Sequence, residues 1–64
     1  MPVVHIYMYE GRTTEQKREL VKRISKDFKE VVDVKPESLN ILFHDMGKTA
    51  WGIRGDLASI TAAK

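Results

Sequence analysis

The sequence has no cysteine and only two histidines, His5 and His44, among its 64 residues. The missing cysteines exclude a disulfide framework, and two separated histidines do not make the ligand cluster of a structural metal. A chain of this length buries only about 60% of the surface that its unfolded form exposes, so a monomer would be marginally stable. Oligomerisation is the remaining support, and we expect a homo-oligomer.

Long apolar runs and an excess of charge of one sign are also missing. Without a run of about 20 apolar residues or a basic and apolar leader, the sequence predicts a cytoplasmic protein that does not enter a membrane. The 11 basic and 9 acidic side chains are well mixed and give a net charge of +2. The electric field at a distance should therefore be weak, and we expect no nucleic-acid partner.

The first segment with a clear structural signal is PVVHIYMY, from residue 2 to residue 9. It is rich in β-branched and aromatic residues, and both of its alternating faces are apolar, which predicts a strand at least partly covered on both sides. The strand should end in the segment Glu10-Gly11-Arg12, because Gly11 can adopt the positive φ that a sharp exit often needs.

A helix is predicted next, starting at Thr13, and Lys35-Pro36 should end the helical region because the residue before proline is disfavoured in the α conformation. Thr13 and Gln16 have the spacing of a capping box. Six apolar residues then recur with a period near 3.6 and form one stripe: Leu20, Val21, Ile24, Phe28, Val31 and Val32. The opposite face is basic, but it includes pairs such as Glu19–Arg23 and no interleaved aromatic residues, so we interpret it as solvated helix surface.

The segment LNILFH, residues 39–44, predicts a second strand with Leu39, Ile41 and Phe43 on one face. Strand, helix and strand in this order form a βαβ unit, whose strands are parallel and joined by a right-handed crossover. The fold class is therefore α/β, with a single domain over residues 1–64. One helix cannot cover both faces of the sheet, so we expect the open apolar face to meet another copy of the chain.

Residues 46–64 form a tail in which glycines surround the short run 49–54. This pattern predicts a short C-terminal hairpin or arm, followed by a single helical turn that Asp56 could cap. Such an arm is too short to pack alone, so we expect it to reach onto a neighbouring subunit.

The most distinctive chemical group lies at the N-terminus, where Pro2 follows Met1. A small residue at position 2 generally permits removal of the initiator methionine, which would leave a secondary amine at the start of the strand. A free α-amino group has a reference pKa of about 7.7–8.0, and burial beside cations lowers it. Such an amine would be neutral near pH 7 and competent as a general base. Proline at position 2 is common, however, and alone indicates no function.

The opening MPVVHIYMYEGRTTEQKREL resembles the 4-oxalocrotonate tautomerase family, in which an amino-terminal proline begins a strand that ends in Glu-Gly-Arg before the helix. The resemblance continues through the second strand and the tail at Asp45-Met46, Lys48, Trp51-Gly52-Ile53 and Gly55. It therefore covers nearly the whole chain. No single motif in it is specific, but the set in this order and at this length is.

The resemblance implies a βαβ subunit that assembles into dimers and then into a homohexamer, a trimer of dimers, with active sites where subunits meet. It implies an isomerase without a cofactor or a metal, in which the Pro2 nitrogen moves a proton from the hydroxyl of a dienol to a carbon of the conjugated chain. Arg12 would bind a carboxylate of this small enol substrate. Trp51 would line the apolar part of the pocket.

One departure from the family concerns Asn40, because well-known members carry a second arginine there that polarises the substrate carbonyl and binds the adjacent carboxylate. Asn40 donates a hydrogen bond without a charge, so a dicarboxylate dienol should be held less well. Arg54 in the tail is a candidate for the missing cation, and a solvated arm residue is the alternative.

Two other functions remain open. Relatives with this scaffold hydrate or dehalogenate short unsaturated acids, which generally needs an acidic residue that activates water, such as Asp45 or Glu10. A non-catalytic hexamer that binds a small acid is the other reading. Removing the basicity of the Pro2 amine separates catalysis from binding, because binding could survive and catalysis could not. A retained Met1 removes that basicity, since it makes the Pro2 nitrogen a tertiary amide.

Overall fold

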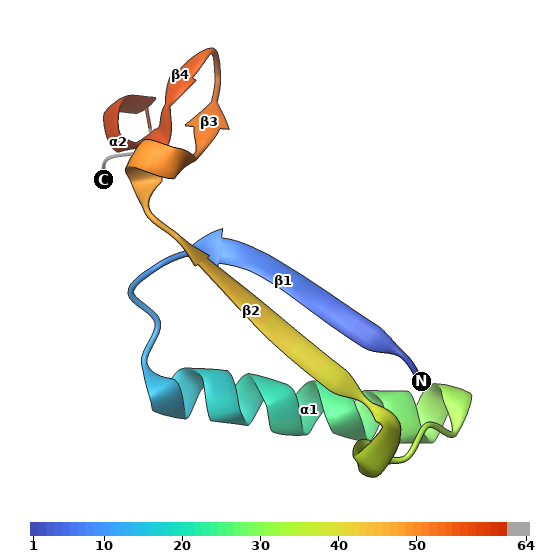
Figure 1. The fold of residues 1–64 in the computed structure, drawn as a ribbon. Helices are drawn as coiled ribbons and strands as arrows, with labels where there is room; N and C mark the ends of the chain where they lie inside the picture. The colour runs from blue at the N-terminus through green and yellow to red at the C-terminus, as the bar shows by residue number, and fades with distance from the viewer. Residues whose placement is uncertain (62–64) are drawn as a thin grey trace.

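The computed structural model describes residues 1–61, and its central element is a βαβ unit of β1 (Val3–Tyr9), α1 (Thr14–Val32) and β2 (Asn40–Met46). The two strands are parallel and in continuous register, from the pair Val3–Asn40 to the pair Tyr9–Met46. Helix α1 lies along one side of this sheet (Figure 1). The predicted α/β fold with parallel strands is confirmed.

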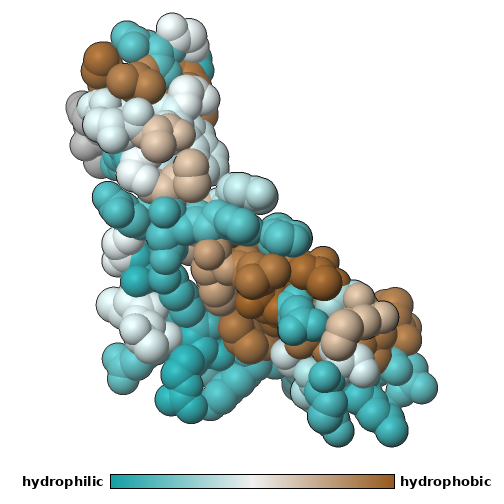
Figure 2. Space-filling model, viewed as in Figure 1, coloured by the Kyte–Doolittle hydropathy of each residue, from teal (hydrophilic) through white to brown (hydrophobic). Residues whose placement is uncertain are grey.

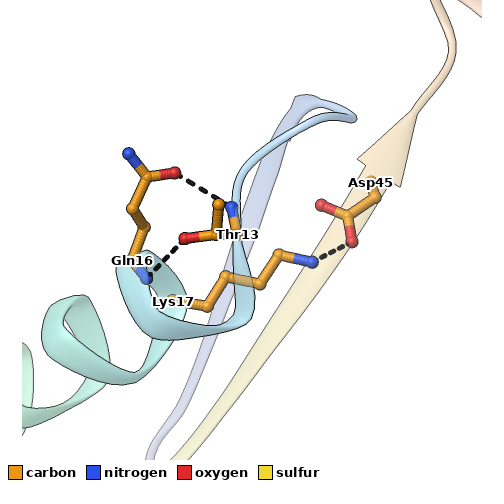
Figure 3. Close-up of polar contacts among 4 residues, drawn as sticks. All are labelled: Thr13, Gln16, Lys17 and Asp45. Atoms are coloured by element: carbon orange, nitrogen blue, oxygen red, sulfur yellow. Dashed lines mark hydrogen bonds and ion pairs between the residues drawn. The ribbon is translucent and has the colours of Figure 1, made fainter.

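The capping box predicted at the start of α1 is present. The Thr13 hydroxyl accepts a hydrogen bond from the Gln16 amide at 3.0 Å, and the Gln16 side chain accepts one from the Thr13 amide at 2.9 Å (Figure 3). One turn into the helix, Lys17 forms an ion pair with Asp45 near the end of β2 (Figure 3). The first turn of α1 is thus tied to the carboxyl end of the sheet.

The helix ends before Lys35-Pro36 as predicted, with Lys35 extended, but it ends earlier than this limit. Helix α1 ends at Val32, because Asp33 adopts a left-handed conformation with φ 56° and its amide donates to the Phe28 carbonyl. Pro36 instead begins the short 3-10 helix η1 (Pro36–Ser38), which the Leu39 amide closes at 3.3 Å from the Pro36 carbonyl. Strand β2 therefore begins one residue later than predicted, and it continues to Met46.

The two faces of the sheet differ in burial. Residues facing α1 are partly buried, and they are Val4, Ile6, Met8, Ile41 and Phe43. On the open face Val3, Tyr7 and Leu42 are 49%, 61% and 45% exposed. Within one chain β1 is therefore covered on one side only, and the end of the predicted helix stripe at Val31 is also exposed, at 80%. Figure 2 shows apolar surface over the βαβ unit and again on the tail.

The tail forms an arm, defined here as residues 47–61, that projects away from the βαβ unit (Figure 1). It consists of η2 (Lys48–Ala50), β3 (Gly52–Ile53), β4 (Asp56–Leu57) and α2 (Ala58–Thr61). Strands β3 and β4 are antiparallel, so the predicted hairpin and helical turn are confirmed. The predicted cap is wrong, because Asp56 lies in β4 and its carboxylate accepts from the adjacent Leu57 amide at 2.7 Å.

The dimensions of the chain show how little core it has. Its radius of gyration is 14.8 Å, whereas a compact chain of this length would have about 11 Å. Its accessible surface is 5040 Å², against about 4,200 Å² for a compact monomer of this mass. Among residues 1–61 only Ala58 is buried. The apolar faces of the sheet, helix and arm are therefore available for contacts with another chain.

Candidate active site

Pro2 and Asn40 lie together at the amino ends of the two strands. The Asn40 amide donates to the Pro2 carbonyl at 3.1 Å, and Asn40 is the register partner of Val3. Pro2 is partly buried, whereas Asn40 is exposed and Met1 is 91% exposed. A free Pro2 amine needs removal of Met1, and this exposed residue packs little against the rest of the chain.

Arg12 lies at the opposite end of β1, in the loop that leads into α1. The loop turns at Gly11, whose φ of 119° confirms the positive value expected there. The Arg12 side chain is exposed and borders an open depression with Met8 and Gln16. No hydrogen bond or ion pair joins this side chain to another of the residues 1–61. Its guanidinium is therefore available to an external anion.

Trp51 lies at the base of the arm, at the same end of the sheet as Arg12. Its ring packs edge-on against Tyr9, with ring centroids 4.8 Å apart and an interplanar angle of 66°. The Trp51 carbonyl accepts from the Ala58 amide at 2.7 Å. Lys48 lies above the other aromatic ring of this group, 5.3 Å from the Tyr9 centroid. Trp51 thus joins the arm to its own sheet and still presents a partly exposed indole.

Within one chain the four predicted site residues form two separate pairs. Pro2 and Asn40 lie at the amino end of the sheet, and Arg12 and Trp51 lie at the carboxyl end (Figure 1). Because a strand rises about 3.3 Å per residue, the length of β1 places about 23 Å between Pro2 and Tyr9. A small enol cannot span that distance. The residues meet around one substrate only if different copies supply them.

Other acid–base groups have partners inside the chain. Asp45 forms an ion pair with Lys17, and this pair lies at the end of the sheet remote from Pro2. On the basic face of α1, Arg23 contacts Glu19 at 2.9 Å, which confirms the predicted pair. Among residues 1–61 no group of three or more metal-ligating side chains occurs.

The histidines form a contact that the sequence interpretation missed. His5 Nδ1 and His44 Nε2 are 2.8 Å apart on the open face of the sheet, and the Tyr7 ring stacks on His44 at 4.2 Å. The available signal was the parallel arrangement of the two predicted strands, which begin at residues 2 and 39. Counting the same number of residues along each strand pairs Tyr7 with His44, as the structure does. Nothing places these rings beside Pro2, so they are not assigned to the site.

Comparisons with known proteins agree with this fold. The family model for the tautomerase enzyme matches residues 2–60. A probable tautomerase of Halalkalibacterium halodurans is 36% identical over 55 residues, which are 86% of this chain and 90% of the relative. A 2-hydroxymuconate tautomerase of Pseudomonas sp. (strain CF600) is 37% identical over 59 residues, or 92% of this chain and 94% of the relative.

Solved structures of similar proteins cover the same length. A 4-oxalocrotonate tautomerase isozyme from Methylibium petroleiphilum has a TM-score of 0.88 at 32% identity, over 97% of both chains. A heterohexamer 4-oxalocrotonate tautomerase from Chloroflexus aurantiacus has a TM-score of 0.83 at 30% identity, over 94% of this chain and 97% of that chain.

The fold and these matches define an isomerase of the enol–keto class. The chain belongs to the tautomerase family, and enol–keto tautomerisation is its activity. Within residues 1–61 no helix combines the length and the apolar character needed to cross a bilayer.

Proposed function

We propose that this tautomerase converts small carboxylated enols of the 2-hydroxydienoate type to their keto form, with the Pro2 amine as general base after loss of Met1. The observation that carries this proposal is the position of Pro2. It directly precedes β1, lies beside the exposed Asn40, and follows Met1, which is 91% exposed. Relatives at 36% and 37% identity are 2-hydroxymuconate tautomerases, which supports the substrate class.

The reaction needs a single base, and it neither consumes nor releases a proton overall. The neutral amine removes the proton of the enol hydroxyl, the oxygen electron pair forms the carbonyl, and the conjugated double bonds shift by one position. The ammonium then returns the proton to a carbon of the chain, which restores the neutral amine. In this scheme Arg12 binds a substrate carboxylate and Trp51 packs against the apolar chain.

The site in this proposal lies between subunits. Pro2 and Asn40 come from one copy, and Arg12 and Trp51 come from others, because a single chain holds these pairs at opposite ends of β1. We propose a homohexamer, a trimer of dimers. The surplus accessible surface of the chain and the heterohexamer from Chloroflexus aurantiacus support this assembly. Sedimentation at micromolar concentration should give six copies, and a 7.3 kDa species would contradict it.

Hydration or dehalogenation is less well supported. Asp45 is paired with Lys17 and lies beside Met8 in the register, far from Pro2 of its own chain. Glu10 lies at the same remote end, where its amide donates to the Met46 carbonyl at 2.9 Å. Neither of these two acidic residues lies close to Pro2 within one chain, so tautomerisation fits better than activation of water by Asp45 or Glu10.

The experiment compares fully processed protein with Pro2→Leu, which removes the prolyl amine. Both are assayed on 2-hydroxymuconate by the loss of dienol absorbance. Because a positioned general base contributes about 10²–10⁴-fold, we expect kcat to fall by at least about 100-fold in the variant. Substrate binding is measured in parallel through the fluorescence of Trp51. The affinity should differ little between the two proteins. Equal kcat values would place the base elsewhere, and binding without turnover in both samples would favour the non-catalytic reading.

A further inference from the structure

A cation is missing from both strands of the proposed site. Neither β1 nor β2 contains a lysine or an arginine, and Asn40 beside Pro2 is uncharged. Arg12 can pair with one carboxylate only. A substrate with two carboxylates therefore needs a second cation from the helix, from the loop that follows it, or from the arm.

The helix is a poor source for this second cation. Several of its basic side chains lie on the exposed face and have acidic partners one turn away. Arg23 contacts Glu19 at 2.9 Å, and Lys29 contacts Asp33 at 2.6 Å. Lys17, on the side of the sheet, forms an ion pair with Asp45. Arg18, Lys22 and Lys35 have no hydrogen bond or ion pair among residues 1–61, but none of them lies in an element that carries a predicted site residue, whereas the arm carries Trp51.

The arm contains two cations among residues 47–61, and they differ in their surroundings. Lys48 lies over the Tyr9 ring at 5.3 Å and has a further contact. The Arg54 side chain has no hydrogen bond or ion pair with any of the residues 1–61. Even the neighbouring Asp56 carboxylate accepts from the Leu57 amide instead. Arg54 is thus an exposed guanidinium that the described residues 1–61 leave uncompensated.

The backbone at Arg54 is unfavourable for an arginine. Arg54 and Gly55 form the two-residue turn between β3 and β4, with φ values of 58° and 84°. Positive φ at both positions is the pattern of a type I′ turn, for which glycine, asparagine and aspartate are the usual first residues. An arginine there gains nothing for the turn itself.

Arg54 is also close to the predicted pocket wall. Two residues separate it from Trp51, so their Cα atoms are three peptide units and at most about 11 Å apart even in an extended chain. The arm exposes apolar side chains on both sides of Arg54 in the sequence, with Ile53 at 37%, Leu57 at 42% and Ile60 at 65%. Such a surface favours contact with another copy, and that contact would carry the Arg54 charge with it.

We propose that Arg54 is a specificity residue that binds the second carboxylate of a dicarboxylate dienol, in the site to which Trp51 of the same arm contributes. This inference rests on the proposed function of that site. It assigns to the arm the charge that Asn40 does not supply, and it predicts a preference for dicarboxylate over monocarboxylate dienes.

The test uses two stable diene acids of equal chain length, hexa-2,4-dienedioate and hexa-2,4-dienoate. Their dissociation constants are measured with fully processed protein through the fluorescence of Trp51, the single tryptophan of the chain. The variants are Arg54→Gly and Arg54→Lys. Arg23→Gln is the matched control, because it removes an exposed charge on the helix surface, away from the arm.

Arg54→Gly should weaken binding of the dienedioate by about tenfold or more, the contribution of a charge-assisted hydrogen bond. Binding of the dienoate should change less than about twofold, since the lost partner exists only in the diacid. Arg54→Lys should retain most of the preference, and Arg23→Gln all of it. Thermal unfolding of Arg54→Gly should be no lower than that of the parent, because glycine suits the turn.

Two results separate this inference from the proposed function. An active parent whose preference for the diacid is unchanged in Arg54→Gly overturns the role of Arg54 and leaves the tautomerase mechanism intact. An inactive parent whose preference for the diacid depends on Arg54 overturns the tautomerase mechanism and leaves the role of Arg54 intact. Adding Asn40→Arg to Arg54→Gly should restore binding of the diacid, and equal losses in Arg54→Gly and Arg23→Gln would reduce the effect to net charge and overturn the assignment.

Discussion

Mixed oligomers of two defective subunits should recover activity. One subunit carries Pro2→Leu and lacks the base, and the other carries Arg12→Ala and lacks the carboxylate partner. Pro2 precedes β1 and Arg12 follows it, and the strand places about 23 Å between Pro2 and Tyr9, so one chain cannot bring both residues to the same small substrate. A site that combines an intact Pro2 from one chain with an intact Arg12 from the other is complete.

The recovered fraction follows from random assembly. In an equal mixture, half of the positions supply an intact Pro2 and half supply an intact Arg12. If two chains meet at each site, about a quarter of the sites are complete in a closed symmetric oligomer. At substrate concentrations well below KM, the expected kcat/KM is therefore about a quarter of the parent value, above the value of about a tenth or less expected for Arg12→Ala alone and above that of Pro2→Leu alone. Neither substitution removes a side-chain hydrogen bond or ion pair within residues 1–61, so both subunits should assemble.

The assay co-refolds the two variants at several ratios and measures turnover of 2-hydroxymuconate. Activity should vary as the product of the two subunit fractions and peak at an equal mixture. Each variant refolded alone serves as the baseline, and parent mixed with parent controls for refolding losses. Activity that never exceeds the sum of the two baselines would refute the intersubunit site.

Three further changes test individual residues. Arg12→Ala should raise KM about tenfold or more for a carboxylated enol and little for an uncharged enol; equal losses would indicate a structural role. Asn40→Arg should improve turnover of a dicarboxylate dienol, and an assembled variant without any gain would show that this pocket suits another substrate geometry. Thr13→Ala should lower the free energy of unfolding by about 1 kcal/mol in urea at fixed protein concentration; a similar loss for the neighbouring Thr14→Ala would contradict the capping role.

Local signals predicted the elements of this fold well. The Thr13–Gln16 capping box and the positive φ of Gly11 depend on side chains within a few residues, and both are present. Pro36 gave only a limit for the end of α1, whereas the helix ends earlier, where Asp33 adopts a left-handed conformation. Such a C-cap at a non-glycine residue has a weak sequence signal, since few residues other than glycine and asparagine are typical there.

Features that depend on two distant segments were harder to predict. The contact between His5 and His44 requires the strand register, which the sequence of either strand alone does not contain. The site residues Pro2, Asn40, Arg12 and Trp51 were selected through a family resemblance. Their division between the two ends of the sheet became visible only with the strand lengths and the parallel topology in place.

The most direct test of the central claim compares two samples that differ only in Met1, which is removed from one and retained in the other. Acylation by Met1 delocalises the lone pair of the Pro2 nitrogen, so kcat/KM should follow the processed fraction measured by mass spectrometry. In processed protein kcat/KM should rise with pH through a single ionisation, because the base works in its neutral form and is lost as the pH falls below its pKa. Equal kcat/KM in the two samples would eliminate Pro2 as the base and contradict the mechanism.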